Sequence, residues 1–411
     1  MLKNIFYFIA FFVLFYIEPL DIGGLKIAIL WKVALIGFII IFLLQSRSYS
    51  FPNFIFYNYL YSVKFLLTTT TFSSVVSAVA QISEFLKSMF IGLFTHFFIA
   101  RSEAKGEYLW IERLGIKLSV FILLSTLPFL LGLMSPLDEG YDLSKYGAEG
   151  FGFIGIFQNA HAASITFAFA LSILTSALAK RRIVKNKIII YILLMVGLYA
   201  LYQTYVRTGF LIYFIALYFI YIKDKKLTTI LVRYVPIAII GLIGLYIAYL
   251  NSPVLQMRFA DKNIYTERQY NAEDQWKKIG SGRLWIWHSA YRNWSEADFY
   301  GKIIGLGMEE AKDLMGEKIG NKIFAHNQFF QSLQESGLIG FVLFIIFLVT
   351  MYKFITKRKS SQFYQTAITI YIGFIILNIF QGGHYFIVDL YLAMYLALLY
   401  LDMNNITMEN R

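Results

Sequence analysis

The sequence predicts an all-α polytopic integral membrane protein with about twelve transmembrane helices and one large external loop domain that contains short helices. The first reason is composition: 58% of the 411 residues are hydrophobic and only 15% are charged, with a mean hydropathy of +0.60. The second is that apolar segments of membrane-spanning length recur along the chain. The third is that the short loops on one side of these segments are strongly basic.

Twelve segments have the apolar character of a membrane-spanning helix, which needs roughly 20 residues, or fewer where aromatic or lysine side chains anchor its ends. The first segment follows a basic start, as in a signal peptide. Bulky residues and Glu18-Pro19 stand where a cleavage site needs small residues, so we interpret it as a retained span. The predicted spans lie near residues 4–17, 25–44, 54–71, 73–100, 116–134, 160–179, 188–205, 208–222, 229–250, 337–355, 363–380 and 384–401.

The charge distribution predicts the topology. With both termini on the inner side, the inner loops carry the basic runs "RSEAKGEYLWIER", "KRRIVKNK", "KDKK" and "TKRK". The outer side receives the segment from Asn251 to Ser336, which holds eleven Lys and Arg residues against eleven Asp and Glu residues. This distribution obeys the positive-inside rule. The predicted organisation is therefore spans one to nine in 1–250, a loop domain in 251–336, and spans ten to twelve with a short tail in 337–411.

The loop domain contains two predicted helices. In "GRLWIWHSAYRNWSE", which Ser281 is expected to cap, Leu284, Trp287, Tyr291 and Trp294 recur at helical spacing and form an aromatic face. Such a face suits a membrane interface or a lipid substrate. Asn327 is expected to cap the helix "QFFQSLQES", and Gly337 is expected to break or kink the chain before the next span.

Several classes of site are disfavoured by the sequence. Cysteine is absent, so thiol nucleophiles and thiolate metal sites are excluded. The sequence has no phosphate-binding glycine loop, no Asp-x-Asp pair, and no His/Asp cluster with metal-ligand spacing. We therefore expect no metal and no cofactor, and a nucleotide-sugar enzyme of the soluble type is disfavoured.

Two arginines are candidates for binding an anion. Arg207, in "YQTYVRTGFLIYF", lies where the seventh span turns into the eighth; at that depth an arginine is paired or functional, or it snorkels to the interface. Arg283 lies in the first turn of the aromatic helix, where free backbone N–H groups favour anions. A guanidinium there would complete a diphosphate site, although a solvated helix-start residue is the alternative.

Two histidines are candidates for proton transfer or substrate contact. His326 precedes the Asn327 cap, and the dipole of a helix N-terminus disfavours an imidazolium, so His326 should be neutral and able to accept a proton. The alternative is a capping or interface residue. His161 begins the sixth predicted span on the same side and is expected to face the same cavity.

The order of these motifs resembles the O-antigen polymerase and O-antigen ligase superfamily. The resemblance rests on "RTGFL" after a middle span, "SGRLWIW" and "GLG" in the long external loop, and "AHNQFFQSLQESGLIG" leading into the next span. Each motif is short, and only their ordered combination is specific. "NAH" at 159–161 departs from the Asn-Pro-Asn of many members, which leaves the role of His161 in doubt.

The resemblance implies a GT-C-like fold and glycosyl transfer from an undecaprenyl-diphosphate-linked glycan to an acceptor hydroxyl. Carried over by motif, Arg207 and Arg283 bind the diphosphate and His326 is the base of an inverting, metal-independent reaction. A diphosphate is already a good leaving group, so two arginines can stabilise its charge without a metal. The implied location is the bacterial inner membrane, with the site facing the periplasm and both termini in the cytoplasm.

The expected contacts to glycan or lipid come from Trp287, Tyr291, Asn327 and His161. A chain-length-regulating membrane protein is a further expected partner, and no nucleic acid is expected. The favoured activity is a surface-polysaccharide polymerase that acts on lipid-linked repeat units, because the Phe-, Ile-, Tyr- and Lys-rich composition suits surface-polysaccharide gene clusters.

Other activities stay open. The same donor site would serve an O-antigen ligase that moves the finished glycan to the lipid A-core. A transporter or flippase is favoured only by Lys64, Glu84 and Lys87 in or beside predicted spans, and it leaves the loop domain unexplained. A structural scaffold predicts no sensitivity at Arg207, Arg283 or His326.

Overall fold

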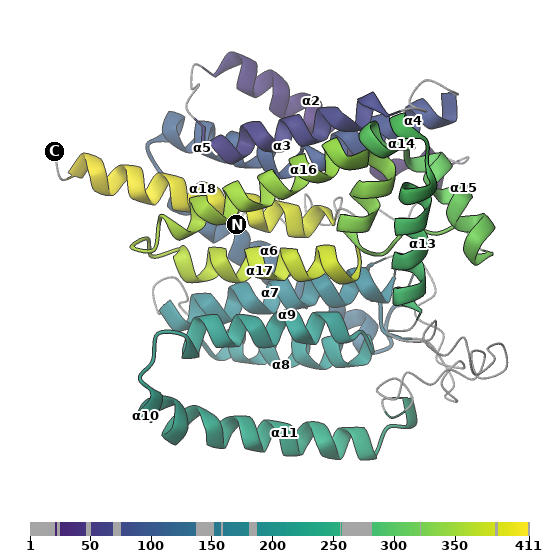
Figure 1. Cartoon of the computed structure of the whole chain (residues 1–411). Coiled ribbons are helices and arrows are strands. Elements are labelled where there is room, and N and C mark those ends of the chain that lie inside the picture. Colours follow the sequence, from purple (N-terminus) through teal and green to yellow (C-terminus); the bar gives the residue numbers. More distant parts are fainter. Residues whose placement is uncertain are drawn as a thin grey trace. The chain divides into compact units, whose positions relative to one another are not determined.

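The structure is a computed structural model that describes residues 21–22, 25–46, 51–68, 75–136, 152–157, 159–180, 187–254, 256, 282–320, 322–382 and 385–409 (Figure 1). These residues are mainly helical, which confirms the predicted all-α class. The exception is a two-residue antiparallel pair, β1 (Asp21–Ile22) with β2 (Leu25–Lys26). The chain divides into two compact units: unit 1 comprises Met1–Leu35 and Arg113–Gln275, and unit 2 comprises Ile36–Glu112 and Trp276–Arg411.

Long apolar helices indicate a membrane protein. Within the described residues, four helices are long and apolar enough to cross a bilayer, and a bent pair would make five. Shorter apolar helices occupy other predicted spans, while the predicted span 4–17 lies outside the described residues. Twelve spans therefore stay a prediction. The four long helices are α6 (Leu109–Leu130), α7 (Ala160–Lys180), α16 (Gln328–Thr356) and, over Phe386–Asn404, α18 (Phe386–Glu409).

In unit 1, α7 packs against α8 (Lys187–Gln203) and α9 (Arg207–Leu217), which lie side by side in Figure 1. Small residues allow this close approach. A methyl group on Gly197 would lie 2.8 Å from Leu171 Cδ2, and one on Gly209 would meet the backbone oxygen of Ser164 at 2.8 Å. Beyond α9 come a π-helical turn (Tyr218–Ile222), α10 (Leu227–Thr229), a second π-helical turn (Ile230–Tyr234) and α11 (Val235–Leu250).

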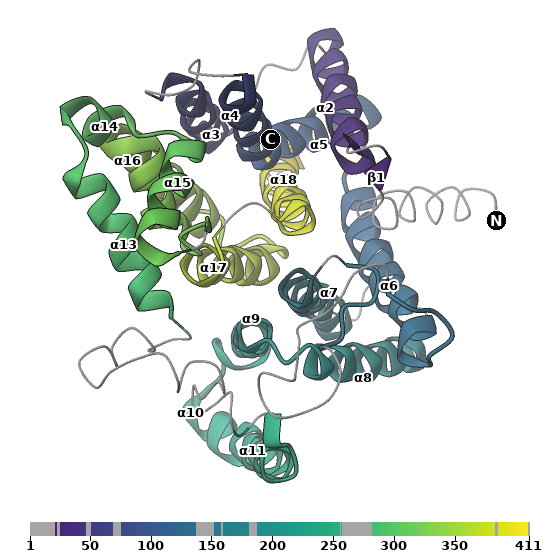
Figure 2. The same ribbon diagram turned by 90° about the vertical axis from the view of Figure 1, so that its right-hand side faces the viewer.

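In unit 2, α18 lies between α5 (Phe90–Lys105) and α17 (Tyr364–Phe380), as the end-on view of Figure 2 shows. Most of its side chains up to residue 402 are buried, as in the interior of a helix bundle. The helix α16 packs along α3 (Asn53–Lys64), which ends in a 3₁₀ turn (Phe65–Leu67). The helix α2 (Ile27–Gln45) crosses the boundary between the two units, and its residues from Ile36 onward belong to unit 2.

The predicted span 73–100 is interrupted. The structure has α4 (Val75–Ser88) and α5 joined at Met89, with a bend of 40° between Gln81–Ser88 and α5. The cause is the side chain of Asn58 on α3. Its Nδ2 donates to the backbone oxygen of Ser88 at 2.8 Å, and its Oδ1 accepts from the backbone N–H of Gly92 at 2.9 Å. Because this amide satisfies backbone groups at the break, the bend is stable without a proline.

Three helices come before α16 along the chain of unit 2: α13 (Arg283–Glu296), α14 (Phe299–Ile304) and α15 (Met308–Ile319). The predicted aromatic helix is α13. Its N-cap is Gly282, with φ of 83°, whereas the expected cap Ser281 lies outside the described residues. The helices α14 and α15 were not predicted. Asp298 caps α14 by accepting from the N–H of Gly301 at 2.6 Å.

The helix α16 begins and kinks where the sequence predicts. The Asn327 side chain accepts from the N–H groups of Phe329 and Phe330 at 2.9 and 3.2 Å. Gly337 leaves the helical region, with φ of 63° and ψ of −169°. The carbonyls of Gln334 and Glu335 accept instead from the N–H groups of Leu306 and Gly307, both at 3.0 Å. The kink thus ties the loop before α15 to the first two turns of α16.

Candidate functional site

His326 occupies the connection between α15 and α16, one residue before the Asn327 cap. Its φ is 50°, in the left-handed region that is costly for a residue with a Cβ atom. Among the described residues, Tyr205 is the only other non-glycine residue with a positive φ. Residues in such strained conformations gather at functional sites, where the surrounding structure holds them in place.

Contacts on both sides hold the backbone at His326. On one side, the N–H of buried Ala325 donates to the side-chain oxygen of Gln331 at 2.8 Å. On the other side, the turn after α17 lies directly against it: a methyl group on Gly382 would be 3.3 Å from the carbonyl carbon of His326. The imidazole also forms a hydrogen bond with the backbone of Gln381. Sequence reasoning did not find these contacts, because they come from residues distant along the chain.

Arg283 lies close enough to His326 to influence its charge. Its guanidinium stands over the ring of Phe380, 6.0 Å from the ring centre, and it also acts electrostatically on the hydroxyl of Tyr385. His326 therefore lies close to Arg283, the first residue of α13, and to the connection between α17 and α18. The structure thus brings together Arg283 and His326, the predicted diphosphate ligand and the predicted base of unit 2.

The surroundings favour the neutral form of the His326 imidazole. Removal of water by neighbouring protein lowers its pKa, and the positive charge of Arg283 lowers it further, while the Gln381 hydrogen bond opposes both. Because that hydrogen bond favours the protonated ring, the imidazole is its donor. One ring nitrogen is then held by Gln381, and the other is left as the acceptor. The residue is nevertheless exposed at the surface.

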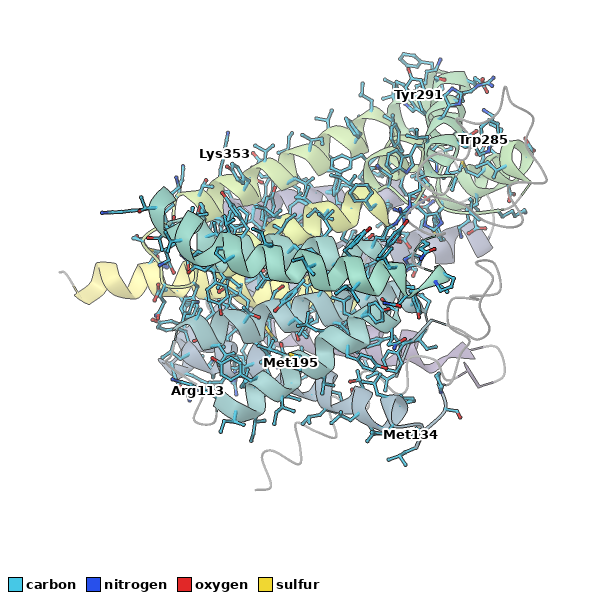
Figure 3. The ribbon with its side chains drawn as sticks, turned by 90° about the horizontal axis from the view of Figure 1, so that it is seen from below. Arg113, Met134, Met195, Trp285, Tyr291 and Lys353 are labelled. Atoms are coloured by element: carbon cyan, nitrogen blue, oxygen red, sulfur yellow. The ribbon has the colours of Figure 1, made fainter. Side chains whose placement is uncertain are left out.

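The aromatic residues of α13 are divided between packing and exposure. Trp287 stacks on Phe330 of α16, with ring centres 6.0 Å apart and planes inclined by 26°. Tyr291 is 46% exposed, so it is free to contact lipid or sugar. Figure 3 shows Trp285 and Tyr291 at one end of unit 2 and Lys353 of α16 towards its other end. Asn327 is buried, and its side-chain oxygen serves as the helix cap.

The other two predicted residues, Arg207 and His161, belong to unit 1. Arg207 is exposed and is the first residue of α9, just after the strained Tyr205. His161 is the second residue of α7, one turn before Ser164. The Ser164 hydroxyl donates to the backbone oxygen of Val206 at 3.3 Å, so the N-terminal ends of α7 and α9 lie together. Arg207 and His161 therefore share one end of unit 1.

The two candidate arginines and His326 have one feature in common. Arg207 and Arg283 are the first residues of helices, and His326 lies two residues before one. The first turn of a helix presents backbone N–H groups that have no intrahelical partner and favours negative charge. In the described part of the chain, no group of three His, Asp or Glu residues is placed to hold a metal ion. Taken separately, the starts of α9 and α13 are each suited to binding an anion with an arginine and backbone donors.

Residues 190–345 match the family model described as O-antigen ligase. The match confirms the resemblance to the O-antigen polymerase and ligase superfamily over this part of the chain. It includes Arg207, Arg283 and His326, together with α13 to α15 and the first half of α16. No curated protein matches the chain.

Proposed function

We propose that this protein is a polysaccharide polymerase that transfers a growing glycan from undecaprenyl diphosphate to a hydroxyl of a lipid-linked repeat unit. The observation that carries the proposal is the neutral, accessible His326 beside the Arg283 guanidinium, within the segment that matches the family. A neutral base next to a fixed cation would assist transfer from a diphosphate donor.

In this mechanism the acceptor oxygen attacks the anomeric carbon while the free nitrogen of His326 takes the hydroxyl proton. The new carbon–oxygen bond forms as the bond between the anomeric carbon and the diphosphate breaks, and its electron pair leaves with the diphosphate. Attack from the opposite face inverts the anomeric carbon. Arg283 stabilises the developing negative charge, and its nearness to His326 also disfavours early protonation of the base.

Arg207 is proposed as the second diphosphate ligand, because it lies within the segment that matches the family model and its position at the start of α9 suits an anion. His161, at the same end of unit 1, is proposed as a glycan contact. Trp287, Tyr291 and Asn327 are proposed to line the path of the glycan or lipid. The site is proposed to face the periplasm from the bacterial inner membrane, with both termini cytoplasmic, since the inner loops are basic.

The second candidate function is O-antigen ligase, which is favoured by the description of the matching family model. Both activities would use the same donor, so the acceptor distinguishes them. Deletion of a polymerase gene should leave single repeat units attached to the lipid A-core. Deletion of a ligase gene should leave none attached.

A purified-component assay tests the proposal directly. The protein, incubated with an undecaprenyl-diphosphate-linked repeat unit and EDTA, should produce a ladder of longer glycans. Omitting the protein is the blank, and a ladder that depends on lipid A-core as the acceptor would instead support the ligase. The absence of transfer to either acceptor would overturn the proposal.

A further inference from the structure

Two exposed aromatic side chains stand at the start of α14, away from the site described above. Phe299 is 73% exposed and Tyr300 is 66% exposed, and no other phenylalanine or tyrosine in the described part of the chain is as exposed. Their rings meet edge to face, with centres 5.8 Å apart, so they form one apolar patch. The question is which partner covers this aromatic pair.

The neighbouring helix α16 shows where lipid lies in unit 2. It is long and apolar enough to cross a bilayer. After Gly337, its exposed side chains up to residue 352 are all apolar and recur at helical spacing along one face. On a membrane-spanning helix, such a face contacts the acyl chains of the lipid. The residues of this lipid-facing side are Leu338, Ile339, Val342, Val349 and Tyr352.

The kink at Gly337 marks the outer edge of the hydrocarbon. In the turns of α16 before it, no residue is exposed, so the lipid-facing side begins at Leu338. From Leu338 to the end of α16 at Thr356 the helix rises about 27 Å, close to the roughly 30 Å of the hydrocarbon core. Lys357 and Arg358 follow at the other end, as expected on the inner side of a membrane.

The helix α14 is fixed at this kink. A methyl group on Gly337 would lie 2.5 Å from both the nitrogen of Gly305 and the carbonyl oxygen of Ile303, so the last turn of α14 touches the kink. Because α14 has six residues, Phe299 lies within about 8 Å of that turn along the axis, which is roughly the depth of the headgroup layer. Figure 2 shows α14 beside α16 at the outer edge of unit 2.

We propose that the start of α14 docks on the outer surface of the bilayer, with Phe299 and Tyr300 inserted between the headgroups and the first acyl carbons. Aromatic side chains gather at this depth, because an apolar ring with a polar edge or hydroxyl suits the boundary between lipid and water. The partner is lipid, and not a glycan or a second protein, because the pair lies at the outer end of the lipid-facing side of α16.

This anchor would hold the candidate site at a fixed height. The indole N–H of Trp294 on α13 donates to the backbone oxygen of Lys302 on α14 at 3.0 Å. Since α13 begins at Arg283, an anchored α14 keeps that arginine at a set distance from the headgroups. A lipid-linked diphosphate would lie at the same level of the bilayer. This consequence rests on the proposed function, whereas the anchor itself does not.

Site-directed spin labelling tests the anchor, and a chain without cysteine is suited to it. The single-cysteine variants Phe299→Cys and Tyr300→Cys carry a nitroxide, with one copy of the full chain in each phospholipid nanodisc. Val342→Cys on α16 is the lipid control, and Glu317→Cys on the exposed side of α15 is the water control. Power-saturation EPR compares collisions with oxygen, which concentrates among acyl chains, and with a water-soluble nickel chelate.

The labels at 299 and 300 should show an oxygen-to-nickel collision ratio several-fold above that at 317, with a depth of about 5–10 Å into the boundary. A ratio equal to that at 317 would overturn the anchor, because the pair would face water. Collisions with neither reagent would also overturn it, because protein would cover the pair.

The replaced rings are mostly exposed, so these variants should unfold at the temperature of the wild type. The measurement also involves no turnover, which separates the two proposals. If the labels lie at the lipid boundary but the wild-type chain transfers nothing to any acceptor, the anchor stands and the proposed function falls.

Discussion

The side-chain oxygen of Gln331 accepts a hydrogen bond from the backbone N–H of Ala325 at 2.8 Å. The amide is held in this orientation from its other side, where its nitrogen donates to a carboxyl oxygen of buried Glu335. The next residue after Ala325 is His326, with its strained backbone. One turn of α16 therefore supports the conformation that presents the imidazole.

Replacing Gln331 with leucine should impair both folding and transfer. The N–H of Ala325, which is 0% exposed, would lose its partner, at a cost of about 1–3 kcal/mol. The backbone at His326 would no longer be held, and misplacing a catalytic group by about 1 Å can cost a factor of roughly 100 in rate. Thermal unfolding and kcat in the ladder assay measure the two effects.

A matched control is Gln362→Leu. The Gln362 side chain donates to Asp402 at 3.0 Å, and Gln362 precedes α17. Gln381 and Gly382, which lie beside His326, instead follow α17. This variant should lower stability by a similar amount but leave kcat unchanged. Equal losses of kcat in the two variants would mean that Gln331 acts only through stability.

The left-handed backbone at residue 326 makes asparagine the informative replacement for the histidine. Asparagine tolerates a positive φ better than alanine does, so His326→Asn should unfold at a temperature equal to or above that of His326→Ala. Transfer should fall by roughly 10²–10⁴-fold because the general base is lost. A well-folded His326→Asn protein that builds the ladder at the wild-type rate would exclude His326 as the base.

The pH dependence of transfer should report the charge of Arg283. An imidazole accepts a proton only when neutral, so kcat/KM should fall as the pH drops through the pKa of His326. That pKa lies below its usual value of 6.5 because of desolvation first and Arg283 second. Arg283→Gln removes the second cause, so the acid limb of kcat/KM should move to higher pH.

The charge-preserving variant Arg283→Lys is the control for this prediction. It loses the planar guanidinium and should bind diphosphate more weakly, yet it keeps the positive charge near His326. Its acid limb should therefore stay close to that of the wild type. A limb that moves equally in both variants would mean that charge at residue 283 does not set the pKa of the base.

The turn at Gly337 should tolerate no side chain. Its φ and ψ of 63° and −169° are accessible essentially to glycine alone, and a methyl group would lie 2.5 Å from the backbone nitrogen of Gly305. Gly337→Ala should thus destabilise by about 3 kcal/mol. Gly320→Ala is the comparison, since Gly320 is also left-handed but has no atom within 4 Å of the added methyl group. It should cost only about 1 kcal/mol, and equal unfolding temperatures would contradict this account.

Local signals in the sequence were sufficient for parts of the fold and site. The Asn327 cap and the Gly337 break were predicted because caps and glycines act on neighbouring backbone. The helix α15 was missed, although Glu309 and Glu310 in its first turn, Lys318 in its last turn and Gly320 after it are helix signals.

The supporting contacts of His326 lay beyond sequence reasoning. Gln331 reaches back to Ala325, while Gln381 and Tyr385 come from a connection more than fifty residues away. Such contacts depend on how helices pack, and no local pattern encodes them. The same holds for Asn58, whose amide divides the predicted span 73–100 into α4 and α5.

A buried lysine separates the transferase from the transporter hypothesis. Lys64 of α3 is 3% exposed, its amino group has no hydrogen-bond partner in the described structure, and its stem packs beside Gly340 of α16. A transporter would need such a charge, whereas the proposed transfer reaction makes no use of it.

Lys64→Met keeps the stem and removes the charge. Since no hydrogen bond compensates for the burial of this amino group, the variant should be as stable as the wild type or more so, and it should still build the glycan ladder. Unfolding temperature and ladder assay are measured together with those of His326→Asn. A folded Lys64→Met protein that has lost all transfer, beside a His326→Asn protein that retains it, would reverse the assignment of the functional residues.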